Sequence, residues 1–480
     1  MRAMTTAATL AAAMLLGAPA WASGDDETGP SLDEAIAQAD TDGAATGSES
    51  AAAGQQGAQG VQALQIDGDM PIDSGTAFNP AISIILDSVY SQNFSGDPGD
   101  PPGFGGGHDH GHDHGHDNGH SHGIEDGFQI REVEAVFSGS VDPYFDMMVQ
   151  LAFFEDGVEL EEGYFTTTSL PGGLQVKGGK FLSDVGYINR QHTHDWDFTD
   201  QPLMTNELFG EEGLNELGAQ VSWVPPTESY TRVGFEALEG DNDHLVNIDG
   251  GSYDDGESVS LSDPSSPRLF TAFGHWGPDL GYDHALQLGV SGGFAPDFQQ
   301  VDEHSSRFDV QDGDAWFAGA DVVYKYDAGR SLGHGNWTLQ AEYFYRERDY
   351  DFVATDGEGN NAVTSDTDQQ DGLYVQGVYG FAPRWNAGLR FDALGLTNDA
   401  FEPGRDDDGE RIREAIDFGT TYRYSAQVSY LPTEFSRLRF QLSQTDLSDG
   451  SDYDHHDHDE AWRADFQFTY ALGVHGAHEF

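Results

Sequence analysis

The 480-residue sequence has no cysteine, few basic residues and, after its first 22 residues, no long apolar run. Without cysteine, neither a disulfide framework nor a thiolate metal site can form. Lys and Arg number 21 against 84 Asp and Glu, which gives a formal net charge of −63. Phosphate contacts require basic patches, so we expect no nucleic acid as a partner. The negative charge favours cationic ligands, although an acidic proteome would produce it too.

The one long apolar run lies at the N-terminus. Residues 1–22 (MRAMTTAATLAAAMLLGAPAWA) combine a single basic residue, Arg2, with an apolar stretch and an A-x-A-like end at Ala20–Ala22. This pattern predicts a secretory signal peptide that is cleaved after Ala22. Because no later segment approaches the ~20 apolar residues of a membrane helix, the exported chain could span a membrane only as a barrel.

Residues 23–77 are of low complexity, rich in Ala, Gly, Gln, Asp and Ser and poor in aromatic residues. We interpret them as a flexible periplasmic linker. Within this linker, Ser31 and Glu34 have the spacing of a capping box, which is compatible with a short helix over Ser31–Asp40.

From residue 78 onwards, apolar and polar residues alternate with a period of two. Residues 217–223 read LGAQVSW and residues 462–472 read WRADFQFTYAL. Such segments predict strands that have one apolar and one polar face. About 16 strands are expected, with centres near Ile85, Val133, Val149, Gly163, Lys177, Gln220, Gly234, Ala272, Leu288, Ala320, Ala341, Val375, Leu389, Ala426, Phe440 and Phe466.

A water-soluble sandwich would show the same alternation, but three features favour a transmembrane barrel. Aromatic residues occupy the strand ends, as an interfacial girdle requires. Short connections alternate with long acidic ones, which predicts short periplasmic turns and long extracellular loops. The chain ends on an amphipathic strand with Phe480 as its last residue, which resembles the signal that the barrel assembly machinery recognises. We therefore expect residues 78–480 to form an all-β, porin-like antiparallel β-barrel in the outer-membrane lipid of a Gram-negative bacterium.

Histidines are concentrated between Gly105 and Gly123, where the sequence reads GGGHDHGHDHGHDNGHSHG. The run lacks the apolar residues that a core needs, so we place it in the first external loop. Imidazole is a ligand for zinc, copper, nickel and iron. A solvated variable loop or a pH sensor would be alternatives. Because the run exceeds the needs of one tetrahedral site, several weak metal sites are expected, with His108, His110, His112, His114, His116, His120 and His122 as ligands.

Two further loops contain His/Asp clusters. In the eighth external loop, DYDHHDHDE contributes His455, His456 and His458, and barrel closure would place this loop beside the first. In many porins the third external loop folds inward and narrows the pore, so metal ligands there could bind a passing cation. Alternatively, its apolar residues simply pack against the wall and leave the ligands as its polar side. The candidate metal ligands in the third loop are His192, His194, Asp195 and Asp197.

Arginines gather at inward-facing positions of the last strands. Such a wall can conduct anions, phosphate included, or its arginines can pair with acidic neighbours and stabilise the barrel. The residues predicted to line the pore are Arg390, Arg423, Arg437, Arg439, Arg463, Glu342 and Asp392.

Three segments carry a family resemblance: GFQIREVEAVFSGSVDPYFDMMVQLAFFEDGVELEEGYF, GGKFLSDVGYINRQHTHDWDF and LFGEEGLNELGAQVSWVPP. They resemble a proteobacterial family of outer-membrane barrels with a His-rich first loop, labelled zinc-regulated receptors or porins and distantly similar to phosphate-selective porins. The resemblance covers about residues 78–480. It implies a 16-stranded channel linked to zinc supply, with metal ligands in the run His108–His122 and at His192, His194, Asp195 and Asp197.

TonB coupling is not expected, because a TonB-dependent transporter needs a plug domain inside a 22-stranded barrel, and residues 23–75 are too short and too simple to supply one.

The sequence thus predicts a passive outer-membrane channel that takes up divalent metal, with Zn²⁺ as ligand or substrate and no tightly bound cofactor. A general or anion-selective porin with incidental histidines is an alternative, and so is a non-transporting surface metal-binding protein. No His-E-x-x-His pattern occurs and no constellation of catalytic residues can be assembled from the sequence, so no enzyme is predicted. A homotrimer is expected by analogy with porins.

Overall fold

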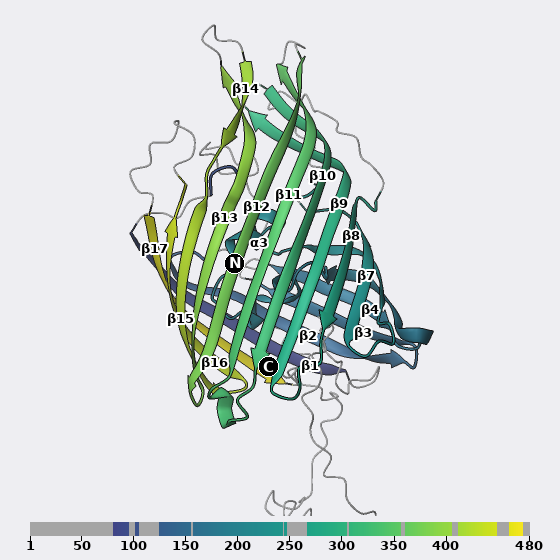
Figure 1. Cartoon of the computed structure of the whole chain (residues 1–480), viewed down its shortest axis with the longest axis vertical. Helices are drawn as coiled ribbons and strands as arrows, with labels where there is room; N and C mark the ends of the chain where they lie inside the picture. Colours follow the sequence, from purple (N-terminus) through teal and green to yellow (C-terminus); the bar gives the residue numbers. More distant parts are fainter. Residues whose placement is uncertain are drawn as a thin grey trace, which may run out of the picture. The chain divides into compact units, whose positions relative to one another are not determined.

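The computed structural model describes residues 80–95, 101–104, 124–154, 157–242, 244–246, 266–304, 307–356, 361–405, 411–448 and 460–473. The chain divides into two units, Met1–Ala58 and Gln59–Phe480. All described residues belong to the second unit, which is an antiparallel β-barrel (Figure 1). The predicted signal peptide, linker and Phe480 lie outside the described residues.

The wall of the barrel consists of strands in the order of the sequence. Their bounds are β1 Ala81–Ser95, β2 Gly127–Asp142, β3 Phe145–Phe153, β4 Val158–Thr167, β5 Leu174–Leu182, β6 Asn215–Trp223, β7 Tyr230–Leu238, β8 Leu269–Gly277, β9 His284–His304, β10 Arg307–Tyr326, β11 Trp337–Asp356, β12 Asn361–Ala382, β13 Trp385–Arg405, β14 Arg411–Asp417, β15 Thr421–Thr433, β16 Ser436–Asp446 and β17 Glu460–Gly473.

Hydrogen bonding closes the sheet, because β1 pairs with both β2 and β17. β13 pairs with β15 along Trp385–Leu394 and with the short β14 along Asp399–Arg405, so β14 and β15 share one position in the wall. The 17 strands of the sheet therefore fill 16 positions. The predicted barrel is confirmed, and each predicted strand centre falls within a strand of the wall.

The two faces of the wall differ in polarity as the alternation predicts. On β17, Asp465 and Gln467 are fully buried and point inward, whereas the outward Phe466 and Tyr470 are 38% and 47% exposed. An apolar outer face around a polar interior is the arrangement of transmembrane barrels. None of the helices in the described ranges is long and apolar enough to cross a membrane.

Strand length varies around the wall, with a short arc and a long arc next to each other. β3 to β8 contain 9 or 10 residues each, close to the ~9–11 that a tilted strand needs to cross a bilayer. β9 to β13 contain 20 to 22 residues and project far beyond the rest at the upper end in Figure 1.

The long strands correct one expectation, because three connections predicted to be long loops are mostly continuations of β9 to β14 as paired hairpins. Above the bilayer both faces of a strand meet water, so these segments need no apolar alternation, and the sequence pattern could not reveal them.

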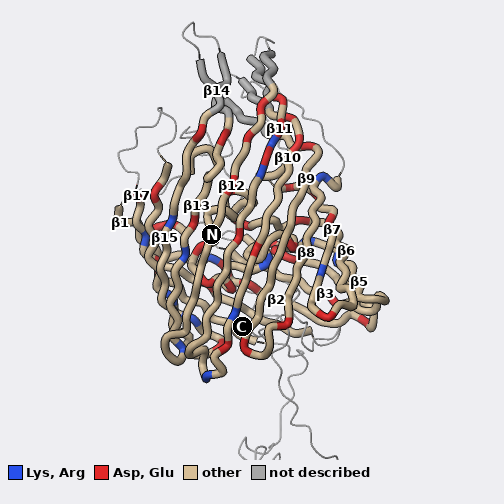
Figure 2. The backbone as a smooth tube through the Cα atoms, viewed as in Figure 1, with Lys and Arg blue, Asp and Glu red and all other residues tan. Residues whose placement is uncertain are grey.

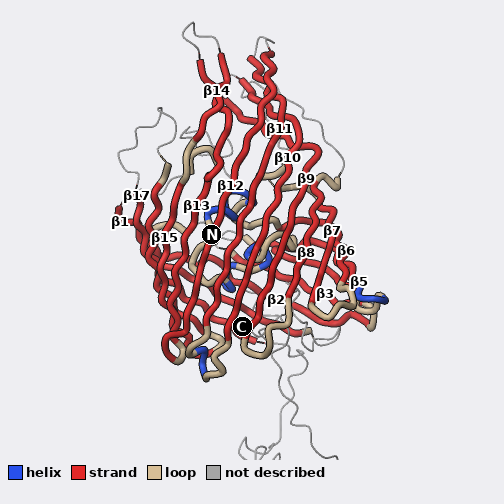
Figure 3. The backbone as a smooth tube through the Cα atoms, in the orientation of Figure 1, coloured by secondary structure: helices blue, strands red, loops and turns tan. Residues whose placement is uncertain are grey.

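The connection from β5 to β6, residues 183–214, folds into the barrel, and we call it the lumen loop. It contains the 3₁₀ turns η2 (Ile188–Arg190) and η3 (Thr193–Asp195) and the helix α3 (Leu203–Phe209), which are seen inside the wall in Figure 3. Two further 3₁₀ turns lie in short connections between strands: η1 (Pro171–Gly173) joins β4 to β5, and η4 (Ser331–Gly333) joins β10 to β11.

Apolar side chains hold the helical part of the lumen loop against β11, β12 and β13. Pro202 precedes the first helical residue, and Gly210 with φ 88° ends the helix. The Phe209 ring lies 5.2 Å from the rings of both Phe317 and Phe344. The buried apolar residues of the loop include Trp196, Phe198, Leu203, Met204, Leu208 and Phe209. Inward folding and packing against the wall, two readings that the sequence left open, therefore both hold.

The start of the lumen loop is fixed by Glu342 on β11. Its carboxylate accepts hydrogen bonds from the backbone N–H groups of Tyr187 (2.9 Å) and Ile188 (2.8 Å). Gly186 has φ 68°, and a Cβ at this position would lie 2.5 Å from Glu342 Oε2. Glu342, one of the residues predicted to line the pore, thus anchors the loop, because unpaired backbone donors inside the barrel need an acceptor.

Candidate functional site

Two histidines of the lumen loop lie side by side against the wall. His192 is extended (φ −70°, ψ 158°) and precedes η3, whereas His194 lies within η3. Their rings are stacked, 6.0 Å apart with an angle of 6° between the planes. They face carboxylates of β2 and β4, so the loop brings imidazoles to an acidic part of the wall.

His194 lies in the first of two groups of potential metal ligands. Its Nδ1 is 2.8 Å from Glu134 Oε1 on β2. Glu132, two residues earlier on the same strand, also points inward, and one ligand atom from each of Glu132, Glu134 and His194 lies within 4.8 Å of the other two. All three side chains are buried, and within the described part of the chain no group donates a hydrogen bond to Glu132 Oε1.

His192 lies in the second group, together with Glu134 and Glu161. The amide nitrogen of Gln150 lies among these three residues, 2.7 Å from Glu134 Oε2, 2.8 Å from Glu161 Oε2 and 3.1 Å from His192 Nδ1. The other ring nitrogen of His192 is 2.9 Å from Glu162 Oε2. Glu162 therefore orients the ring and leaves Nδ1 facing Glu134 and Glu161.

A β-bulge makes this arrangement possible. Opposite β3, Gln150 pairs with Glu162 and Leu151 pairs with Leu160, so Glu161 is an extra residue in β4. Because a bulge breaks the period of two, Glu161 and Glu162 can both turn inward. The sequence analysis missed both as site residues; the only available signal was the adjacent Glu pair that interrupts an alternating strand.

A small pocket opens beside His192. It gives the site an acidic approach, since three of its residues are glutamates. Burial lowers the basicity of His192, but the hydrogen bond and charge of Glu162, with the charges of Glu134 and Glu161, outweigh burial and raise the pKa of His192 well above its ordinary value. The pocket is lined by Glu161, Leu182, Gln191, His192, Thr193, Trp196, Glu211, Glu212 and Asn215.

The predicted H-x-H-D-x-D cluster is only partly assembled. Asp195 Oδ1 lies 3.6 Å from His194 Nε2 and so stays beside the site. Asp197 does not join it, because its Oδ2 lies 3.5 Å from Gln376 Nε2 on β12. The η3 turn ends at Asp195 and Trp196 is extended (φ −60°, ψ 144°), so the chain carries Asp197 away from the two histidines.

The ten histidines at 108–122 and 455–458 lie outside the described residues. The pairing of β1 with β17 does place Ser95 opposite Trp462, as the predicted seam requires. However, the segment that precedes the first run is fixed elsewhere: Pro102 and Gly103 accept hydrogen bonds from Asn398 and Gln370, on β13 and β12. The chain therefore leaves the seam before it enters the histidine run.

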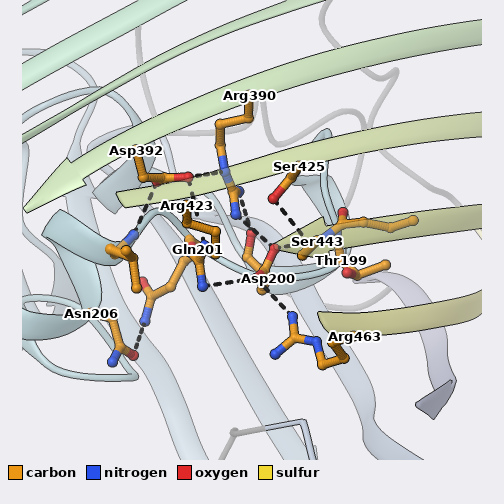
Figure 4. A network of polar contacts seen from close by, with 12 residues as sticks. Thr199, Asp200, Gln201, Asn206, Arg390, Asp392, Arg423, Ser425, Ser443 and Arg463 are labelled. Atoms are coloured by element: carbon orange, nitrogen blue, oxygen red, sulfur yellow. Dashed lines mark hydrogen bonds and ion pairs between the residues drawn. The ribbon is translucent and has the colours of Figure 1, made fainter. Parts of the chain in front are cut away.

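The predicted arginine wall binds the lumen loop around one aspartate, Asp200 (Figure 4). Its Oδ1 lies 2.7 Å from Arg390 Nη2, and its Oδ2 lies 3.1 Å from Arg423 Nη1 and 2.8 Å from Arg463 Nη2. Burial opposes ionisation of Asp200, but the charges of Arg423, Arg390 and Arg463 outweigh it and hold its pKa well below the ordinary value. We call Asp200 and its three arginines the arginine knot; the sequence analysis missed Asp200.

The other predicted wall residues also contact the loop or one another. Asp392 lies 3.0 Å from Arg390 Nε, and Arg437 and Arg439 donate to the backbone carbonyls of His194 (2.5 Å) and Trp196 (2.7 Å). Figure 2 shows acidic and basic positions mixed within the barrel. All five arginines bind the lumen loop, and Arg390 and Arg463 also pair with the acidic neighbours Asp392 and Asp465, which the sequence left open as the alternative to anion conduction. Their role in lining a pore stays a prediction.

No protein-family model matches the chain. Among solved structures, OmpT of Vibrio cholerae is 12% identical (TM-score 0.44, 82% of this chain and 97% of that chain). The outer-membrane channel DcaP of Acinetobacter baumannii is 14% identical (TM-score 0.45, 82% and 97%). The anion-selective porin from Comamonas acidovorans is 10% identical (TM-score 0.43, 82% and 99%). All three TM-scores are below 0.5, so the assignment of the porin-like barrel rests on the strand pairing described above.

An uncharacterized protein of Aquifex aeolicus (strain VF5) is 30% identical to this chain over 360 residues. The match covers 74% of this chain and 70% of that protein. With this identity over most of both sequences, the chain belongs to the same family as the Aquifex aeolicus protein.

Proposed function

We propose that the protein is an outer-membrane channel for divalent metal, with Zn²⁺ as its first candidate substrate, and that ions bind in the lumen at His192 and His194. The observation that carries this proposal is the group of two imidazoles and four glutamates where the lumen loop meets β2 and β4. Nitrogen and carboxylate oxygen are ligands that zinc accepts.

The burial of these carboxylates supports a cationic substrate. Glu132 and Glu134 are at most 1% exposed, and buried carboxylates are costly unless a cation or a proton compensates them. Glu161 and Glu162 add to the same acidic group. A divalent ion would compensate this charge and reach the site from the acidic pocket beside His192.

The sequence supplies the rest of the proposal. The signal peptide and the family resemblance favour the outer membrane, and the external histidine runs would raise the local metal concentration at the mouth. Binding of metal at the mouth requires no energy input, which agrees with a channel that does not depend on TonB. The homotrimer stays a prediction, to be measured by light scattering of the purified barrel.

The anion-selective alternative has weaker support. Asp200, Asp392 and Asp465 together compensate Arg390, Arg423 and Arg463, so these arginines offer little free positive charge to a passing anion. A non-transporting metal-binding protein differs from the proposal by its lack of conductance, which the same experiment measures.

The test is current through planar bilayers containing the purified barrel. We expect a reversal potential in a ZnCl₂ gradient that indicates zinc permeation, and a block of the potassium current by micromolar zinc. The double variant His192→Ala/His194→Ala should lose the block, whereas His284→Ala, at an exposed site in β9, should keep it. A reversal potential set by chloride alone, or a block that survives the double variant, would contradict the proposal.

A further inference from the structure

We infer that the lumen site binds two divalent ions at once and that Glu134 bridges them. The outer ion would be held by His192 and Glu161, and the inner ion by His194 and Glu132. This inference rests on the proposed function only for the class of ligand, a divalent metal. Its geometric basis is that the two ligand groups are distinct and share Glu134 alone.

The orientation of Glu134 supports the bridge. Its Oε1 lies 2.8 Å from His194 Nδ1, and its Oε2 lies 2.7 Å from Gln150 Nε2, beside His192. Each oxygen is thus directed into a different group. A carboxylate that presents one oxygen to each of two ions is the usual bridge in two-metal sites, whose ions lie ~3.5–4 Å apart.

The outer position is marked by the amide nitrogen of Gln150. This nitrogen is within 3.1 Å of ligand atoms from Glu134, Glu161 and His192, so it lies where an ion with these three ligands would lie. An amide nitrogen has two protons, so it can direct a well-aligned N–H at only two of these three acceptors. Gln150 therefore acts as a replaceable occupant, and rotation of its amide would clear the position.

The inner position is marked by an unpartnered oxygen. Glu132 is 1% exposed and belongs to the ligand group of Glu134 and His194. Among the described residues, no group donates a hydrogen bond to Glu132 Oε1. An unsatisfied buried carboxylate oxygen is unfavourable by itself. Zinc ligands in a tetrahedral site are roughly 3.4 Å apart, so the three ligand atoms, now within 4.8 Å, need to approach by about 1 Å.

The route from the pocket determines which of the two metal positions is occupied first. The pocket beside His192 contains Glu161, Glu211 and Glu212, so an ion reaches the outer position first. His194, Glu132 and Glu134 are buried behind it. An ion would therefore pass from the outer to the inner position, with Glu134 as a ligand in both.

The experiment counts bound metal on the full-length barrel whose histidines at 108–122 and 455–458 are replaced by serine. We expect two Zn²⁺ per chain in calorimetry. Two Co²⁺ per chain should give an exchange-coupled paramagnetic resonance signal, which only a bridged pair produces. His192→Ala and His194→Ala should each leave one ion, Glu134→Gln should abolish the coupling, and the control His284→Ala should keep both ions.

Gln150→Ala tests the outer position separately. We expect about tenfold tighter binding of one of the two ions, because the amide no longer competes for two carboxylates. A single ion per chain in the serine background, two uncoupled Co²⁺ ions, or loss of both ions in His192→Ala would overturn the inference. Heat-modifiable migration in electrophoresis establishes that each variant is folded.

The outcomes separate the inference from the proposed function. If one ion binds and zinc still permeates, the two-ion site is wrong and the channel proposal stands. If two coupled ions bind but no zinc current flows, the inference stands and the transport proposal fails.

Discussion

Replacement of Asp200 by asparagine is expected to release the lumen loop from the arginine knot. The carboxylate contacts Arg390, Arg423 and Arg463 at 2.7–3.1 Å, and the side chain of asparagine keeps its shape but not its charge. The three arginines of the knot and the acidic residues Asp200, Asp392 and Asp465 together are neutral, and the substitution changes the charge of this group to +1.

The size of the effect follows from the burial of the knot. Removal of one partner from a buried ion pair costs about 3–5 kcal/mol, and the lower value is appropriate beside a water-filled lumen. About 3 kcal/mol corresponds to roughly a 100-fold change in the ratio of attached to detached loop. The freed arginines would also attract anions into the lumen.

Single-channel recording in planar bilayers measures both consequences. We expect the fraction of time in a high-conductance state to rise by about two orders of magnitude and the reversal potential in a KCl gradient to shift towards chloride. Asp283→Asn, an exposed position in a short turn, makes the same change in net charge and should have no effect. An Asp200→Asn channel with unchanged open time and selectivity would refute the inference that the arginine knot holds the lumen loop in place.

Three further predictions concern the same loop. The pKa of Asp200 is held well below its ordinary value, so the stabilisation by its charge is complete above the unfolded-state pKa of ~3.9 and is lost as the pH falls through the folded-state pKa. The fraction of time in the high-conductance state should therefore be equal at pH 7 and pH 5. A rise of this fraction already at pH 5 would contradict the role of Asp200. Gly186→Ala should lower the midpoint temperature of heat modification, because the new Cβ combines an unfavourable φ of 68° with a clash against Glu342. The control Gly329→Ala, at φ 63° with nothing within 4 Å of the Cβ, has only the backbone cost of about 1–2 kcal/mol. Equal midpoints for the two variants would argue against the clash. Phe209→Ala should destabilise the packing of α3 by about 3–5 kcal/mol, because the ring contacts with Phe317 and Phe344 are lost. The measurement is amide hydrogen exchange in α3, which should become faster; unchanged exchange would disprove this packing.

Side-chain polarity was sufficient to predict the wall. In residues 217–223 and 462–472 the apolar positions are the ones that face outward, because in a strand alternate side chains point to opposite faces. The inward direction of Arg390 and Asp392 followed from the same rule. By contrast, the extended hairpins of β9 to β14 were predicted as loops, since strands surrounded by water carry no such pattern.

The candidate site was predictable in part. His192 and His194 are predicted as candidate ligands from their spacing, and the structure does bring the two rings together. Their partners could not be recognised: Glu134 is 60 residues from His194 in the sequence, and Glu161 faces inward only because of a bulge.

By itself, the sequence determined the strands, the 16 positions of the barrel and the residue types that can bind metal, because these depend on the local order of polar and apolar side chains. Only the tertiary structure decided that the lumen loop crosses the barrel interior, that Asp200 compensates the arginines and that Glu134 lies between two histidines. These contacts join a loop to wall residues as many as 266 positions away. Their partners are selected by the shape and charge of the closed barrel, which no local pattern in the sequence records.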